Sequence, residues 1–211
     1  MKYIIMCGGS YDEWETPRQL EKVRGEPIVI RTIRLLRENG VREIFISSND
    51  PRFEKCGALV IHHDNPYHAR KMNDVDGHWC DCFYPTFEPA CYIFGDVIFS
   101  PEAIRTIVET ETDGIEFYGS AKPFAPEYAK KWVEPFAFKV EDQERFHAAV
   151  EKLKELDDKC WRKPISWDLW ALIQGRRIDI DDYVVDYKVI NDYTCDVDHK
   201  KDIAKIERRM P

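Results

Sequence analysis

Three aspartates stand where a carboxylate could hold a metal ion. The first, Asp96, follows the apolar run Tyr92–Phe94 and Gly95, and a second apolar stretch, 97–99, comes after it. Such a run predicts a buried strand, and in open α/β sheets ligands bind where strands end. A carboxylate is costly to bury there without a partner, and a divalent cation is a suitable one. The position therefore points to metal-assisted phosphate chemistry.

The other two aspartates, Asp196 and Asp198, lie two residues apart near the end of the chain. Alternate residues of an extended segment point to the same side, so both carboxylates could face one cation. Simpler roles stay open for all three residues. Asp96 could be a turn residue or a helix N-cap, Asp198 could cap a helix that begins at His199, and Asp196 could be solvated.

A glycine-rich loop follows the first apolar run, which ends at Cys7. Gly8, Gly9 and Ser10 come directly after it. Glycine lets the backbone approach a ligand closely, and bare N–H groups can hold phosphate oxygens, although any tight turn would use the same residues. We expect the loop 7–10 to contact nucleotide phosphates.

Apolar periodicity predicts alternating strands and helices. Strands are predicted at 3–7, 43–48, 58–62, 91–99, 114–118, 132–140 and 183–190. Helices are predicted at 27–39, 101–111, 143–156, 166–174 and 200–209. Pro135 indicates that the run 132–140 is an edge strand. The alternation predicts an α/β fold, a three-layer α/β/α sandwich around a Rossmann-like, mostly parallel mixed sheet.

Composition limits the class of protein. The chain has 211 residues, enough for a full core, and we expect residues 1–211 to form a single domain. The net charge of −8 argues against a nucleic-acid partner. An odd number of cysteines, several in apolar runs, is typical of reduced thiols in a cytoplasmic protein. Nothing resembles a signal peptide or a membrane span, so no membrane partner is expected, and a homodimer remains open.

The order of the motifs resembles that of the nucleotidyltransferases with a GT-A-like fold. These proteins typically begin with a strand, a Gly-Gly loop, a Pro-Lys pair, a Gly-x-Pro motif and a long helix. The matching positions here are Gly8, Gly9, Pro17, Arg18, Gly25 and Pro27. The resemblance continues at Phe94-Gly95-Asp96 and at Cys195–Ile203, so it is spread along nearly the whole chain.

This resemblance implies an enzyme that transfers the NMP group of an NTP to a phosphorylated small molecule and releases pyrophosphate. The acceptor would be a sugar 1-phosphate or a phosphocholine-like molecule. The resemblance also implies Mg²⁺ or Mn²⁺, bound by Asp96 and by the closing motif with Asp196 and Asp198. Arg18 stands where the family has a lysine and would contact the phosphates. Lys122 follows the strand 114–118 and is expected to face the second phosphate, so we expect Arg18, Asp96 and Lys122 to carry catalysis.

A further stretch resembles one subgroup of the family. Asn65-Pro66 and Asn73-Asp74-Val75 are similar to a stretch of the phosphocholine cytidylyltransferases and of some sugar-phosphate relatives. There the second element lies near the base, which implies that Asn73 and Asp74 contact the nucleobase, although both could instead cap a helix. The resemblance also places Gly95 next to the nucleotide.

One loop departs from the family pattern. The family carries an arginine a few residues past the glycines, whereas the stretch 10–15 is shorter and acidic here. The acidic loop makes a non-catalytic nucleotide-binding homologue one alternative, and a glycosyltransferase of the same fold that uses a nucleotide sugar is another. Glycosyltransferases usually show Asp-x-Asp at the metal strand, so the single carboxylate of Asp96-Val97-Ile98 favours the nucleotidyltransferase.

Overall fold

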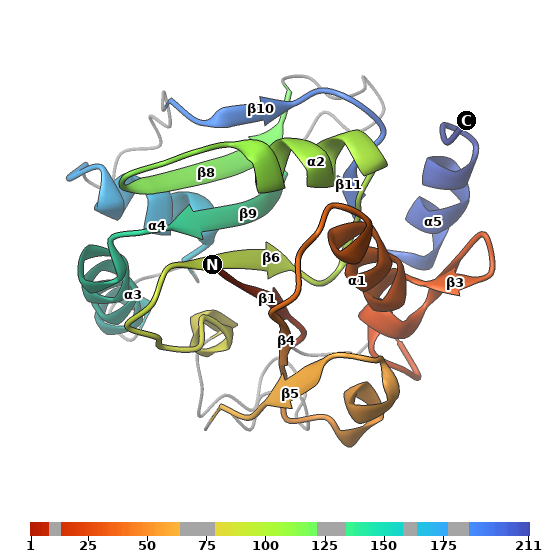
Figure 1. Cartoon of the computed structure of the whole chain (residues 1–211), viewed down its shortest axis with the longest axis horizontal. Helices are drawn as coiled ribbons and strands as arrows, with labels where there is room; N and C mark the ends of the chain where they lie inside the picture. Colours follow the sequence, from red (N-terminus) through yellow and green to blue (C-terminus); the bar gives the residue numbers. More distant parts are fainter. Residues whose placement is uncertain (9–13, 64–78, 122–133, 158–163, 177–185) are drawn as a thin grey trace.

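A seven-stranded sheet lies at the centre of the protein (Figure 1). The computed structural model describes residues 1–8, 14–63, 79–121, 134–157, 164–176 and 186–211. The strands are β1 (Lys2–Met6), β4 (Ile44–Ser47), β5 (Leu59–Ile61), β6 (Ala90–Phe94), β8 (Ile115–Ser120), β9 (Pro135–Val140) and β10 (Lys188–Ile190). Their order is β10-β8-β9-β6-β1-β4-β5, and all neighbours run parallel except β9, which is antiparallel to β6 and β8. The sheet is mixed and mostly parallel, as predicted.

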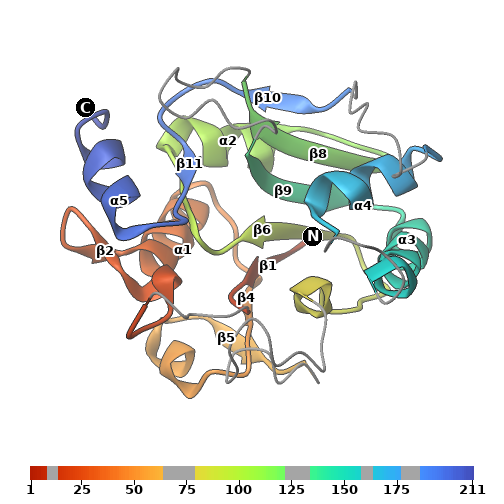
Figure 2. The same ribbon diagram turned by 180° about the vertical axis from the view of Figure 1, so that it is seen from behind.

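Helices cover both faces of this sheet. On one face lie α1 (Ile28–Glu38) and α2 (Pro101–Glu109), and on the other lie α3 (Gln143–Asp157) and α4 (Ser166–Ile173) (Figure 1 and Figure 2). Residues of β1 alternate between the two cores: Tyr3 packs in the cluster that contains α1 and α2, and Ile4 packs in the cluster that contains α3 and α4. The predicted three-layer arrangement is confirmed. Among the described helices, none has both the length and the apolar character that a membrane crossing requires.

Local signals explain where α2 begins and where α1 ends. The Ser100 hydroxyl accepts a hydrogen bond from the backbone N–H of Ala103 at 2.8 Å, and Pro101 occupies the first turn, where no N–H is needed. Just beyond the end of α1, Gly40 has a φ of +81°, a left-handed conformation that glycine adopts without strain. Both helices lie within the ranges that the sequence predicts.

The apolar run 91–99 does not form one strand. β6 ends at Phe94, Gly95 and Asp96 form a turn, and β7 (Val97–Ile98) belongs to a separate two-stranded sheet. Its antiparallel partner is β11 (Cys195–Asp196). The break therefore brings a segment from the end of the chain beside Asp96.

The prediction that the run 132–140 forms an edge strand is wrong, because β9 pairs on both sides. Pro135 is tolerated because it is the first residue of the strand, where a missing N–H removes no ladder bond from the interior. The last strand of the sheet, β10, is also shorter than predicted, since residues 186 and 187 lie outside it.

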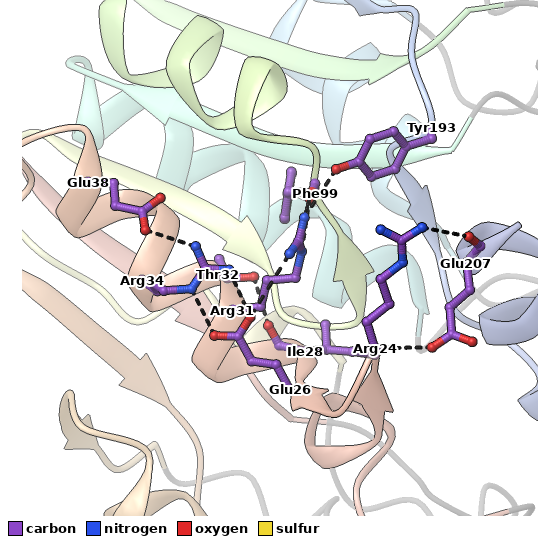
Figure 3. Close-up of polar contacts among 10 residues, drawn as sticks. All are labelled: Arg24, Glu26, Ile28, Arg31, Thr32, Arg34, Glu38, Phe99, Tyr193 and Glu207. Atoms are coloured by element: carbon purple, nitrogen blue, oxygen red, sulfur yellow. Dashed lines mark hydrogen bonds and ion pairs between the residues drawn. The ribbon is translucent and has the colours of Figure 1, made fainter. Parts of the chain in front are cut away.

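A short hairpin fastens the last helix to the protein (Figure 3). It consists of β2 (Lys22–Val23) and β3 (Glu26–Pro27), and Arg24 in its turn has a φ of +48°. The backbone N–H of Arg24 donates to Glu207 Oε1 at 2.6 Å, and its Nη2 donates to Met210 O at 2.8 Å. Since Glu207 ends α5 (Lys200–Glu207), these bonds hold α5 against the hairpin, and both elements share a third apolar cluster with β7 and β11.

A buried lysine on β9 closes the C-terminal end of α2. Lys139 is 6 % exposed, and its Nζ donates to the carbonyl oxygens of Ile107 at 3.0 Å and Val108 at 2.9 Å. These carbonyls belong to the last turn of α2, where no N–H of the helix remains to satisfy them. Lys139 thereby joins the helix to the middle of the sheet.

We expect Lys139→Met to lower the free energy of unfolding by about 1.5–3 kcal/mol, because charge-assisted hydrogen bonds are lost in a buried place. Urea denaturation measures the change. The control is Lys188→Met on β10, where the lysine is half exposed and its Nζ lies 3.9 Å from Glu116. Removing that pair should change stability by less than about 1 kcal/mol. Equal effects of the two substitutions would contradict the assigned role of Lys139.

Candidate functional site

The turn after β6 is packed tightly against the end of β1. The backbone N–H of Gly95 donates to Met6 O at 3.0 Å. A Cβ at Gly95 would lie 2.4 Å from Met6 O and 2.7 Å from Cys7 Sγ, so only glycine fits. This close approach fixes Asp96 beside the point where β1 ends and the glycine loop begins.

Arg18 brings Asp96 and Asp198 together. The arginine lies at the start of the short 3-10 segment η1 (Arg18–Leu20), and its Nη2 forms an ion pair with Asp96 Oδ2. Its Nη1 lies 3.5 Å from Asp198 Oδ1 and donates to Val197 O at 3.3 Å. One guanidinium thus contacts two of the three carboxylates that the sequence singles out as metal ligands.

The small sheet of β7 and β11 explains why Asp198 reaches this place. Asp196 pairs opposite Val97, and the backbone N–H of Val197 donates to Asp96 O at 2.9 Å. The chain therefore runs directly past the Asp96 turn before α5 begins. The side chain of Asp198 is 44 % exposed and that of Asp96 is 17 % exposed, so the pair opens to solvent on the Asp198 side.

Asp196 belongs to a different group of residues, which contains Glu134 and Cys195. Its backbone N–H donates to Glu134 Oε2 at 3.2 Å, and ligand atoms of Glu134, Cys195 and Asp196 all lie within 4.8 Å of one another. This is the one such group of three in the part of the chain that the structure describes, and it does not include Asp96 or Asp198. Of the three predicted metal ligands, Asp96 and Asp198 thus contact Arg18, and Asp196 contacts Glu134 through its backbone.

Sequence reasoning missed Glu134. The residue is 5 % exposed and immediately precedes β9. Because β9 is antiparallel to β6 and β8, its first residue lies at the edge of the sheet where those two strands end. Glu134 therefore lies at the same edge of the sheet as Asp96. The available signal was a glutamate directly before Pro135 at the start of a strand, but strand direction cannot be read from that pattern.

Gly8, the first glycine of the loop, packs against Cys82 and His63. A Cβ at Gly8 would lie 2.0 Å from Cys82 Sγ and 3.5 Å from His63 Nε2. Cys82 Sγ and His63 Nε2 are 3.8 Å apart, and the backbone N–H of His63 donates to Asn49 Oδ1 at 3.1 Å. Burial raises the pKa of Cys82 to about 12, so the thiol stays neutral and adds no negative charge behind the loop.

Cys7 lies directly before Gly8 in the same loop. It is fully buried, and its carbonyl accepts a hydrogen bond from Ser48 Oγ at 2.9 Å. Burial raises the pKa of Cys7 well above its usual value, and the nearby Asp96 charge adds to the shift. Cys7 is thus a neutral packing residue under the Asp96 turn.

The remaining predicted residues are Gly9, Ser10, Asn73, Asp74 and Lys122, and they lie outside the described residues. Described residues resume at Trp14, which is buried and has the ammonium of Lys200 at 5.6 Å from its ring centroid. The next residue, Glu15, is exposed. Trp14, the first described residue after the loop, is therefore held against the first residue of α5.

Two solved structures share this fold over nearly the whole chain. A Bacillus anthracis protein assigned as a glucose-1-phosphate thymidylyltransferase, in complex with a sucrose, has a TM-score of 0.60 at 17 % identity over 99 % of this chain and 94 % of that one. HddC from Yersinia pseudotuberculosis, complexed with GMP-PN, has a TM-score of 0.54 at 13 % identity over 98 % of both chains. No family model matches the sequence, and no curated protein matches it. The likeness confirms a nucleotidyltransferase-like fold.

Proposed function

We propose that this protein is a nucleotidyltransferase that transfers the NMP group of an NTP to a phosphorylated small molecule, with Mg²⁺ or Mn²⁺ as cofactor. One observation carries the proposal: Arg18, Asp96 and Asp198 meet where β1 and β6 end, directly beside the glycine loop. This combines carboxylates for a cation, a guanidinium for phosphate and a backbone that permits close approach.

The proposed reaction exchanges one phosphoanhydride bond for another. An oxygen of the acceptor's phosphate attacks the α-phosphorus of the NTP, and the bond from that phosphorus to its bridging oxygen breaks, so pyrophosphate leaves. Because the acceptor supplies the nucleophile, the protein needs no nucleophilic side chain. Its task is to bring two polyanions together, neutralise their charge and align them.

Asp96 and Asp198 fit a divalent cation. They already lie on either side of one positive charge, and the oxygens of these carboxylates and of Val197 are the hard donors that Mg²⁺ and Mn²⁺ prefer. A cation bound there would supply charge that offsets the negative α-phosphate. Asp196 stays a proposed ligand, and Glu134 would orient it by accepting its backbone N–H.

The other proposed assignments follow the resemblance to the nucleotidyltransferases. The backbone of residues 8–10 would hold the triphosphate, Asn73 and Asp74 would contact the base, and Lys122 would face the acceptor's phosphate. Lys122 directly follows Ala121, whose backbone N–H donates to Ile190 O just past the end of β8. β8 runs parallel to β6, since both are antiparallel to β9, so β8 ends at the edge of the sheet where Asp96 lies, and Lys122 follows shortly after β8 in the sequence.

With Mg²⁺ saturating, we expect Arg18→Ala to weaken NTP binding by roughly ten- to a hundredfold, because one charge-assisted phosphate contact is lost. Isothermal calorimetry measures it. Arg34→Ala is the control, since Arg34 on α1 pairs with Glu26 of β3 and with Glu38, and its loss should leave the affinity within about twofold. Equal NTP affinities of Arg18→Ala and wild type would remove Arg18 from the site.

Pyrophosphate release tests the function directly. The purified protein is given Mg²⁺, one of CTP, UTP, GTP, ATP or dTTP, and either a sugar 1-phosphate or phosphocholine. Release that depends on both substrates is the expected result. Binding of NTP without turnover would favour the non-catalytic homologue, and sugar transfer from a nucleotide sugar would favour the glycosyltransferase.

A further inference from the structure

Arg18 has two tasks that it cannot perform at once. Its guanidinium pairs with Asp96 and Asp198, which are the proposed metal ligands, while the proposed reaction also needs it on the triphosphate. A cation at the two carboxylates would stand where this positive charge stands now. An NTP that engages Arg18 would likewise draw it away from both carboxylates.

We infer that Arg18 is the internal counter-ion of Asp96 and Asp198 in the ligand-free protein, and that its release couples metal binding to nucleotide binding. The inference rests on the proposed function. A metal ion alone must displace Arg18, and a nucleotide alone must pull Arg18 from two carboxylates. Each ligand removes the obstacle to the other, so the coupling is positive and, by linkage, equal in both directions.

The surroundings of Arg18 allow its side chain to move while its backbone stays. The side chain is 29 % exposed. The neighbouring Gln19 is 1 % exposed, Pro17 is buried, and the backbone N–H of Leu20 donates to Pro17 O at 2.8 Å. The backbone of η1 is therefore held firmly on both sides of Arg18. The long side chain can then carry the guanidinium from the carboxylates to a phosphate while the backbone stays in place.

Removal of the arginine should therefore strengthen metal binding. Without Arg18, the carboxylates of Asp96 and Asp198 lose the cation between them, and their mutual repulsion favours a divalent ion. A catalytic arginine with no such second role predicts the opposite sign or no change. The sign of the effect on metal affinity thus separates the two roles.

The experiment measures Mn²⁺ binding by electron paramagnetic resonance in wild type, Arg18→Gln and Arg34→Gln, with no nucleotide present. Both variants lose one positive charge, but Arg34 pairs with Glu26 and Glu38 instead of the site aspartates. We expect Arg18→Gln to bind Mn²⁺ about three- to tenfold more tightly than wild type, a range set by partly exposed ion pairs. Arg34→Gln should stay within about twofold of wild type.

A second arm adds inorganic triphosphate, which needs no knowledge of the base. Triphosphate should tighten Mn²⁺ binding more in wild type than in Arg18→Gln, because only the wild type has an arginine to release. Equal enhancement in the two proteins, or equal Mn²⁺ affinity without triphosphate, overturns the inference. If the wild type then still releases pyrophosphate from NTP, the proposed function stands without the coupling. If no protein of the set binds Mn²⁺, the inference and the proposed metal site both fail.

Discussion

Asp96→Asn is expected to lower the rate of pyrophosphate release by about a hundred- to a thousandfold, the range typical when one preorganised electrostatic contact at the reacting phosphate is removed. Asparagine keeps the size of the side chain and fits the turn after Gly95, so the fold should be preserved. What it loses is the charge that pairs with Arg18 and that would bind the proposed cation. Steady-state turnover at saturating Mg²⁺, together with the thermal melting temperature, measures both effects.

Asp81→Asn is the matched control for this substitution. Asp81 has a side-chain exposure of 21 %, close to the 17 % of Asp96, and it also pairs with a basic residue, Lys154, at 2.8 Å. It belongs to the 3-10 segment 79–82, and its partner Lys154 lies on α3. Its loss should change turnover by no more than about twofold. Near-normal turnover in Asp96→Asn would show that the catalytic site lies elsewhere.

Gly8→Ala is expected to destabilise the fold by about 1–3 kcal/mol and to weaken NTP binding, because overpacking forces neighbours to shift. The new Cβ would lie 2.0 Å from Cys82 Sγ, so either the cysteine or the glycine loop must move. Urea denaturation reports the first effect, and calorimetry with NTP and saturating Mg²⁺ reports the second.

The double variant Gly8→Ala, Cys82→Ala identifies the cause. Removing the sulfur makes room for the new methyl group, so the double variant should regain much of the stability and NTP affinity that Gly8→Ala loses. Gly114→Ala is the control, since nothing lies within 4 Å of its added Cβ. Failure of Cys82→Ala to restore either quantity would mean that Gly8 matters for its backbone alone and not for its contact with Cys82.

Local patterns predicted the elements and part of the site. The run 3–7 and the pair Gly95-Asp96 are local signals, because an apolar run and a polar break can be recognised within a few residues. The contact of Arg18 with Asp198 joins residues far apart in the chain, and only the resemblance to a family indicated that both belong to one site.

The direction of a strand was the main feature of the fold that the sequence could not predict. The same apolar pattern serves a parallel and an antiparallel strand, so the central position of β9 and the placement of Glu134 could not be read from it. The splitting of the run 91–99 into β6 and β7 was hidden for a related reason. Val97 and Ile98 are fully buried, and their partners Asp196 and Cys195 lie about a hundred residues further along the chain.

The pairing of β7 with β11 has a consequence for synthesis on the ribosome. The seven-stranded sheet has all its strands once Ile190 has been made, but Val97 and Ile98 still wait for residues 195 and 196. At translation speeds of about 5–20 residues per second, the roughly hundred residues from Ile98 to Cys195 take about five to twenty seconds to synthesise. Throughout this interval the nascent chain carries Asp96 without Asp198, so the proposed cation site can form only after the last strand of the seven-stranded sheet has been made.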